Sequence, residues 1–201
     1  MKQLIAIAFV LVFLTVPAMS QQVTQQNNST CTAKFAQALS IRGIHLGMSA
    51  DELFTLFPDA GNNERIRRAL EDAKGYPNFG NITFQPQLSV DITKERWAGI
   101  NYIFLRIFDN RVVSYSVSYE GPPKGAQWDS TDQWIAKLSE TLELPRPSEW
   151  SLINGNKGLN CEGVIINASE GSIGVYTEEW IAPVKARVKA YDEQKRREFK
   201  P

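Results

Sequence analysis

The sequence is poor in the residues that most metal and catalytic sites require. Its 201 residues include two cysteines and one histidine. Zinc sites usually take several His or Cys ligands, so no metal site is expected. The phosphate-binding P-loop, the dinucleotide-binding glycine pattern, the Gly-x-Ser-x-Gly turn and the His-Glu-x-x-His motif are missing as well. We therefore predict no catalytic residue, no metal and no cofactor.

An excess of charge of either sign is also missing. The chain has 22 basic and 22 acidic residues, a balance that gives no general attraction to nucleic acid. Hydrophobic residues make up 43% of the chain, with ten Phe, six Tyr and five Trp. That content is enough for a packed core and indicates neither a disordered nor a fibrous protein.

Long hydrophobic runs are confined to the start of the chain. An apolar run over residues 4–16 follows Lys2, and residues 17–20 end in the small-x-small pattern that signal peptidase accepts. The run is shorter than the roughly 20 residues of a membrane-spanning helix. A retained anchor fits less well, because a polar stretch follows at once. We expect a signal peptide over 1–20, cleaved near Ser20, and an exported soluble protein, periplasmic or secreted, with no transmembrane segment.

Removal of residues 1–20 leaves 181 residues. Residues 21–30 are almost entirely Gln, Asn, Ser and Thr and are predicted to form a disordered leader. In an oxidising compartment, Cys31 and Cys161 are expected to form a disulfide. Closing so long a loop stabilises a fold by roughly 4–5 kcal/mol on the chain-entropy model. A redox pair is the alternative, but such cysteines usually lie close together as Cys-x-x-Cys.

Three helices are predicted in the first half of the chain. A short one lies within 32–40. Ser49 and Glu52 form a capping box for the second, which Pro58 ends. The third spans about 63–74, just before a glycine. The apolar stripes that these helices would bury are Phe35, Ala36 and Leu39; Leu53, Leu56 and Phe57; and Ile66, Leu70 and Ala73.

Two strands at 99–108 and 111–119 form the clearest predicted hairpin, and a further strand is expected at 88–92. Asp109 and Asn110 supply a two-residue turn that pairs Phe108 with Arg111. With that register, one side of the hairpin is continuously apolar or aromatic and should face the core. On this side, Ile100, Tyr102 and Phe104 lie opposite Tyr119, Val117 and Tyr115. On the other side of the hairpin, Ile103 and Leu105 lie opposite Ser116 and Ser114.

The glycine- and proline-rich segment 121–125 is the best candidate boundary. After it, Ser130 caps a helix with Trp134 in its buried stripe, and Pro145 stops that helix. A second hairpin is expected from 159–168 and 172–176, and a charged helix closes the chain from about Pro183 to Phe199. We predict an α+β protein of short helices on antiparallel sheet. Its halves, 31–120 and 126–201, share a helix-plus-hairpin plan within one fused unit.

Aromatic side chains supply the candidate binding surface. An exposed patch around Tyr102 and Tyr115 in the hairpin, or in the loop of Trp128, would mark a docking site. Glu178 and Glu179 beside Trp180 could form an acidic, aromatic edge of the kind that suits sugar recognition. The interpretation we favour for these three is a loop before the last helix in which Trp180 is a packing anchor, because so short a motif is weak without its context.

Other polar residues have ordinary structural explanations. His45 could act as a lone base, but a structural residue at a strand end is favoured. Asp51 and Glu52 could form an acid/base pair, but capping already explains them. The last helix carries seven basic and three acidic residues and could make weak contact with an anionic surface. A solvated basic helix end is favoured unless Tyr191 and Phe199 prove exposed.

Residues 44–49, followed by Glu52 and Leu53, resemble a short feature of small bacterial exported proteins: a hydrophobic approach, Gly-Met-Ser/Thr and a capped helix. These families are the SmpA/OmlA-type outer-membrane assembly lipoproteins and the beta-lactamase-inhibitor-like proteins. Residues 108–112 are similar to their sheet hairpin turn. The resemblance covers about residues 41–120. It implies two short helices before an antiparallel sheet and a non-enzymatic domain that binds another protein through its sheet or loops.

Three functions remain open on sequence alone. The first is a non-enzymatic binding or assembly module whose partner is another envelope or secreted protein. The second is an envelope glycan-binding or glycan-cleaving protein, which for hydrolysis requires two carboxylates about 5–9.5 Å apart. The third is a purely structural domain. Without a catalytic set in the sequence, we rank binding to a protein first.

Overall fold

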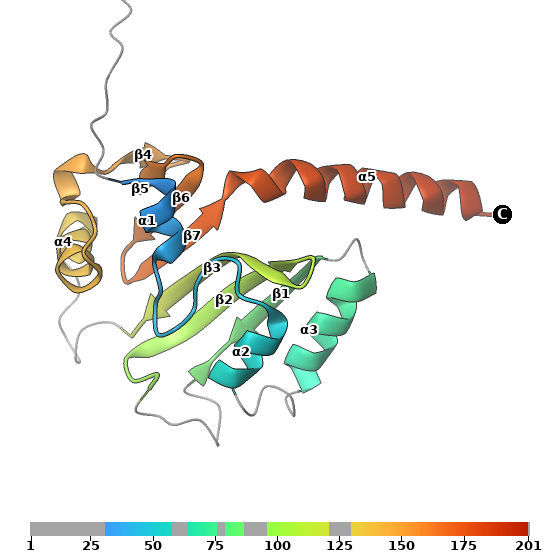
Figure 1. Ribbon diagram of the computed structural model, residues 1–201, viewed down its shortest axis with the longest axis horizontal. Coiled ribbons are helices and arrows are strands. Elements are labelled where there is room, and N and C mark those ends of the chain that lie inside the picture. Colours follow the sequence, from blue (N-terminus) through green and yellow to red (C-terminus); the bar gives the residue numbers. More distant parts are fainter. Residues whose placement is uncertain (1–30, 58–63, 76–78, 87–95, 121–129, 201) are drawn as a thin grey trace, which may run out of the picture.

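The computed structural model describes residues 31–57, 64–75, 79–86, 96–120 and 130–200. This part of the chain forms five α-helices and one seven-stranded antiparallel sheet (Figure 1), so the predicted α+β class is confirmed. The helices are α1 (Ala33–Ala38), α2 (Ala50–Leu56), α3 (Glu64–Gly75), α4 (Thr131–Leu142) and α5 (Ile181–Glu198). The strands are β1 (Phe79–Phe84), β2 (Ile100–Phe108), β3 (Arg111–Tyr119), β4 (Ser151–Ile153), β5 (Asn156–Cys161), β6 (Val164–Ser169) and β7 (Ser172–Thr177). No helix among the described residues is long and apolar enough to span a membrane.

The strand order is β1-β2-β3-β7-β6-β5-β4, with every neighbouring pair antiparallel. Strands β1 to β3 come from the first part of the chain and β4 to β7 from the second. The two sets join where β3 pairs with β7. Each set therefore places its last strand at the centre of the sheet, and one sheet runs through both parts.

One side of the sheet forms the core. Tyr115 pairs with Leu105 on β2 and with Val175 on β7, and all three side chains are buried. Because side chains alternate along a strand, paired residues lie on the same face. The buried row across the sheet reads Ile82, Leu105, Tyr115, Val175, Ile166 and Leu159.

The short helices attach to this core face through specific contacts. The Tyr115 hydroxyl donates to the carbonyl of Leu39 at the end of α1, with 3.0 Å between the oxygens. At the end of α2, the ring of Phe57 lies 4.3 Å from that of Phe84 on β1, centroid to centroid. On α4, the ring of Trp134 meets that of Tyr119 edge-on. Helix α3 packs beside β1 (Figure 1). These four helices therefore form one layer.

The predicted caps are present. The hydroxyl of Ser49 accepts from the backbone N–H of Glu52, and the Glu52 carboxylate accepts from the backbone N–H of Ser49. This is the reciprocal capping box. Ser130 caps α4 by accepting from the backbone N–H of Gln133. Because the Ser49 cap also pairs with Arg111 in an isolated β-bridge, the start of α2 is tied to the β2–β3 turn.

The predicted register of the β2–β3 hairpin is wrong in its middle. The turn pairs Phe108 with Arg111 as expected, but the pairing then slips by one residue between Arg106 and Ile107. Leu105 therefore lies opposite Tyr115, which moves Phe104 and Tyr102 to the other side of the sheet. A second irregularity between Ile100 and Tyr102 restores the predicted pairing at the far end. Each bulge adds one residue to a single strand, which transfers the intervening side chains to the opposite face.

Other boundaries also differ from the predictions. The stretch 159–168, expected to be one strand, is broken by a turn whose Glu162 and Gly163 have positive φ, so β5, β6 and β7 replace the predicted pair. Strands β1 and β4 were not predicted. Helix α5 begins two residues before Pro183. The strand expected at 88–92 lies outside the described residues.

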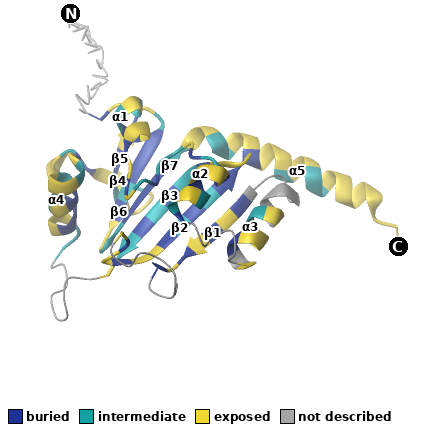
Figure 2. Cartoon of the chain, turned by 60° about the horizontal axis from the view of Figure 1, so that its bottom comes forward, coloured by how far each residue is buried: buried dark blue, intermediate teal, exposed yellow. Residues whose placement is uncertain are grey.

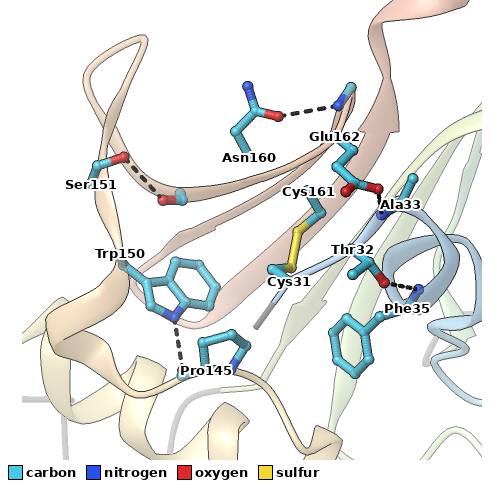
Figure 3. The surroundings of a disulfide bond; sticks show 12 residues. Cys31, Thr32, Ala33, Phe35, Pro145, Trp150, Ser151, Asn160, Cys161 and Glu162 are labelled. Atoms are coloured by element: carbon cyan, nitrogen blue, oxygen red, sulfur yellow. Dashed lines mark hydrogen bonds between the residues drawn. A yellow bond between two sulfur atoms is a disulfide. The ribbon is translucent and has the colours of Figure 1, made fainter. Parts of the chain in front are cut away.

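The predicted disulfide joins Cys31 to Cys161, whose Cα atoms are 4.9 Å apart (Figure 3). Both cysteines are buried. The carboxylate of Glu162 accepts from the backbone N–H of Ala33 at 3.1 Å, which fixes the first turn of α1 beside the turn that follows β5. The bond therefore fastens the first helix across the strands of the second part of the chain.

Replacing both cysteines by serine should lower the free energy of unfolding by about 4–5 kcal/mol, because the unfolded chain regains the freedom of a loop closed across 130 residues. Guanidinium unfolding of oxidised wild type, reduced wild type and the double variant measures this. The reduced wild type serves as the control and should match the variant. Equal stability of all three would contradict the prediction.

The capping box predicts a dependence of stability on pH. The hydrogen bonds from the backbone N–H and then the hydroxyl of Ser49 lower the pKa of Glu52. A carboxyl whose folded-state pKa is below its unfolded value stabilises the fold at neutral pH, and this contribution is lost as pH falls through the folded-state pKa. Glu52→Gln should therefore reduce stability at pH 7 and leave it nearly unchanged at pH 3, which urea unfolding at both values measures. An equal loss at pH 3 would contradict this assignment.

Candidate functional site

The side of the sheet opposite the core face is the candidate site, and we call it the open face. It is defined by three rows of paired residues, which the four helices α1 to α4 do not cover in the described part of the chain. The rows are Tyr102, Ser118, Ser172 and Ser169; Thr83, Phe104, Ser116, Gly174, Asn167, Gly158 and Ser151; and Asn81, Arg106, Ser114, Tyr176, Ile165 and Asn160.

The open face is nearly free of charge. Its rows contain one charged residue, Arg106, whereas 22% of the whole chain is charged. The other members are small, hydroxyl or amide residues, three aromatic residues and the buried Ile165. Removing a charge from water costs far more than removing a hydroxyl or an amide that finds a hydrogen bond. This face can therefore be dehydrated by a partner at a lower cost than a typical charged surface.

Exposure along the open face is uneven. Tyr102 is 38% exposed, and Phe104 and Tyr176 are half-buried. Gly174 is buried because the side-chain oxygen of Asn167 lies where a Cβ would be built on the glycine. That glycine therefore makes room for a neighbouring side chain within the protein. The accessible aromatic surface lies toward β2.

Arg106 is held between two aromatic rings. Its guanidinium carbon lies 5.8 Å from the centroid of Phe104 and 5.0 Å from that of Trp180. Its Nε also donates to the side-chain oxygen of Asn81 at 3.4 Å. Burial lowers the pKa of Arg106. Such stacking positions a planar guanidinium and is favourable where water is partly excluded.

The rim of the open face is formed by η4 (Glu178–Trp180) and the base of α5. Arg187 on α5 makes a two-pronged ion pair with Asp109 in the β2–β3 turn, and its Nη2 lies 2.7 Å from one carboxylate oxygen. The guanidinium also lies over Phe108, 4.6 Å from the ring centroid. The hydrogen bond to Asp109 raises the pKa of Arg187. This contact closes the end of the face beyond Arg106.

The structure separates the two tyrosines that were predicted to share a binding surface. Tyr102 lies on the open face. Tyr115 is fully buried in the core, where burial raises the pKa of its hydroxyl. Its assignment to a binding surface is therefore wrong. Tyr115 stays on the core-facing side, and the β-bulges move Tyr102 to the other side. Trp128 lies outside the described residues.

The remaining predicted site residues lie at the rim. Glu178 and Glu179 are exposed on η4, which Thr177 caps by accepting from the backbone N–H of Glu179 at 3.3 Å. Trp180 is half-buried against Arg106. Sequence reasoning missed Phe104, Arg106 and the serines of β3 as site residues. The every-second-residue spacing of those serines was the available signal.

The single histidine lies away from the open face. Its Nδ1 is 2.9 Å from the carbonyl oxygen of Leu46, in the segment before α2. No group of three or more His, Cys, Asp or Glu residues that could hold a metal ion occurs among the described residues. On α5, Phe199 is 75% exposed and Tyr191 is half-buried beneath Lys195, so the proposed contact with an anionic surface remains a prediction.

Comparisons of the chain with protein-family models, with curated proteins and with solved structures found no match. The resemblance at residues 44–53 therefore stays an expectation from the sequence.

The contrast between the two tyrosines gives a direct test of the face assignment. Tyr115→Phe should lower the free energy of unfolding by about 1 kcal/mol, because the buried carbonyl of Leu39 loses its hydrogen bond. Tyr102→Phe, on the exposed side, should change it by less than about 0.5 kcal/mol. Thermal and urea unfolding of both variants measures the difference. A larger loss for Tyr102→Phe would reverse the assignment of faces.

Proposed function

We propose that this chain is an exported, non-enzymatic module that binds another envelope or secreted protein on its open face. The observation that carries the proposal is the composition of that face: tyrosine, phenylalanine, serine and asparagine with a single arginine. Serine, tyrosine, glycine and asparagine, with arginine at the strongest contacts, also dominate the binding surfaces of antibodies. Rigid aromatic rings supply contact area at a low entropic cost, and small polar residues supply adaptable hydrogen bonds.

The aromatic and cationic cluster marks the expected centre of binding. Tryptophan, tyrosine and arginine are the residues whose truncation most often weakens protein interfaces. Tyr102 and Phe104 lie on neighbouring rows of β2, and Arg106 follows on the next row. This side of the open face therefore offers a contiguous set of anchors, and the serines of β3 border it.

The dimensions of the face suit a protein partner. Seven strands about 4.8 Å apart and about five residues along β2 give roughly 29 by 15 Å. That flat area is about half of the roughly 800 Å² that each partner contributes to a standard interface. A partner of ordinary size would therefore also contact the rim, where η4 and the base of α5 lie.

Export is supported by two independent features. The apolar run before Ser20 has the pattern of a signal peptide. The disulfide between Cys31 and Cys161 is a bond that persists in oxidising compartments and is rare in the cytosol. Together they favour the periplasm or the secreted space over the cytoplasm.

Glycan binding is the second candidate, favoured by the exposed ring of Tyr102 and the exposed amide of Asn81 on the same face. Small-ligand sites are usually concave and gather their polar groups at a few points. Here the polar groups are spread across all seven strands instead. We therefore rank a protein partner above a sugar.

The test uses the mature oxidised chain, residues 21–201, as bait in an envelope extract of the organism that encodes it. Captured proteins are identified by mass spectrometry, made recombinantly and titrated against the bait. We expect a one-to-one complex whose affinity falls at least about tenfold in Tyr102→Ala/Phe104→Ala, because central aromatic anchors dominate binding energy.

Leu152→Ser is the matched control, because Leu152 is 75% exposed but lies on β4 and outside the rows of the open face. It should bind like the wild type. A complex that tolerates the double variant but not the control would place binding elsewhere. The bait is also sedimented with purified wall polysaccharide. If it captures no protein partner but binds the polysaccharide, and the same double variant loses that binding, the glycan-binding candidate replaces the protein-binding one.

A further inference from the structure

Helix α5 projects from the sheet as an arm, and the C-terminal end of the chain lies at its far end (Figure 1). Val184 in its second turn is the helix's buried residue, and the outer turns are mostly exposed (Figure 2). The helix follows β7 directly through η4. Its support from the body is therefore concentrated at its base.

The outer part of the arm is stabilised by pairs within the helix. Glu193 forms ion pairs with Lys189 one turn before it and with Arg197 one turn after it, at 4.0 and 3.9 Å. Lys195 pairs with Glu198 at 3.3 Å. Pairs three or four residues apart support a solvent-exposed helix without a neighbouring element. The arm can therefore remain helical whatever its direction.

Two arginines hold the base from opposite directions. Arg187 reaches from the arm to Asp109 in the β2–β3 turn and covers Phe108. Arg106 reaches from the open face to Trp180, the residue immediately before α5. A two-pronged pair of arginine with carboxylate fixes orientation as well as distance. Together with the burial of Val184, these contacts hold the base of the helix.

We propose that α5 is a hinged arm whose direction is set by this two-arginine clamp at the rim of the open face, so that occupation of the face and movement of the arm are coupled. Both clamp points involve β2, since Arg106 belongs to the open face and Phe108 is the next residue on that side. A partner whose carboxylates reach Arg106 or Arg187 competes with the contacts that hold the arm.

The existence of the clamp is independent of any partner, whereas its coupling to binding rests on the proposed function. Coupling between two sites must be reciprocal in binding free energy. Releasing the arm therefore changes the affinity of the open face, and filling the face changes the freedom of the arm.

The experiment measures N–H residual dipolar couplings of the full mature chain by NMR in a weakly aligning medium. The alignment of α5 is fitted separately from that of the sheet. In wild type the two should agree in magnitude and direction. In Arg187→Gln the magnitude for α5 should fall below that of the sheet, while its helical chemical shifts stay unchanged. The indole signal of Trp180 should shift as well, because the second clamp point loses its fixed geometry.

Lys189→Gln is the matched control, because it removes one positive charge from the same helix without touching the clamp. Its α5 alignment should match that of the wild type. Arg187→Lys, which keeps the charge but not the two-pronged geometry, should fall between wild type and Arg187→Gln. An α5 that stays aligned with the sheet in both Arg187→Gln and Trp180→Ala would overturn the proposal, and this outcome would leave binding to the open face intact.

Discussion

The antiparallel pairing of β3 with β7 is the contact on which the rest of this structure depends. It joins two sets of strands from different parts of the chain into one sheet, with Tyr115 opposite Val175 on the core side and Ser116 opposite Gly174 on the other. Because the side-chain period of a strand is two, this register aligns Tyr115, Val117, Ile173 and Val175 on one face and the serines with Gly174 on the other. A slip by one residue at this seam would place serines in the core.

The positions of the helices and of the disulfide follow from this separation of the sheet into an apolar and a polar side. Four helices bury the apolar side, and the bond from Cys31 to Cys161 holds the first of them across the second set of strands. Their apolar stripes leave the polar side without a helix layer in the described residues. The β2–β3 turn links the two sides, since Ser49 pairs with Arg111 beside the core and Asp109 binds Arg187 beside the open face. One turn thus anchors both α2 and α5.

The sequence predicted correctly those features that depend on interactions between residues close together in the chain or on a unique pair. The caps at Ser49 and Ser130, the two-residue turn at Asp109 and the disulfide all depend on a few residues or on a pair of unique ones. The candidate site was predicted only in part. Tyr102 and Trp180 lie at the open face and its rim, whereas Tyr115 is in the core. The regular hairpin placed both tyrosines on the core-facing side. Tyr102 leaves that side because of bulges, and the strand pattern does not reveal the extra residue of a bulge.

The sequence by itself therefore determined the helix starts, the main hairpin turn, the cysteine pairing and the α+β class, because propensity, capping and alternation act over a few residues. Only the tertiary structure decided which side of the sheet each aromatic residue occupies and that Arg106 meets Trp180. Two bulges in β2 and β3 form so that apolar side chains are buried against helices distant in sequence. That burial is a property of the assembled core, so it overrides the register that the hairpin would choose alone.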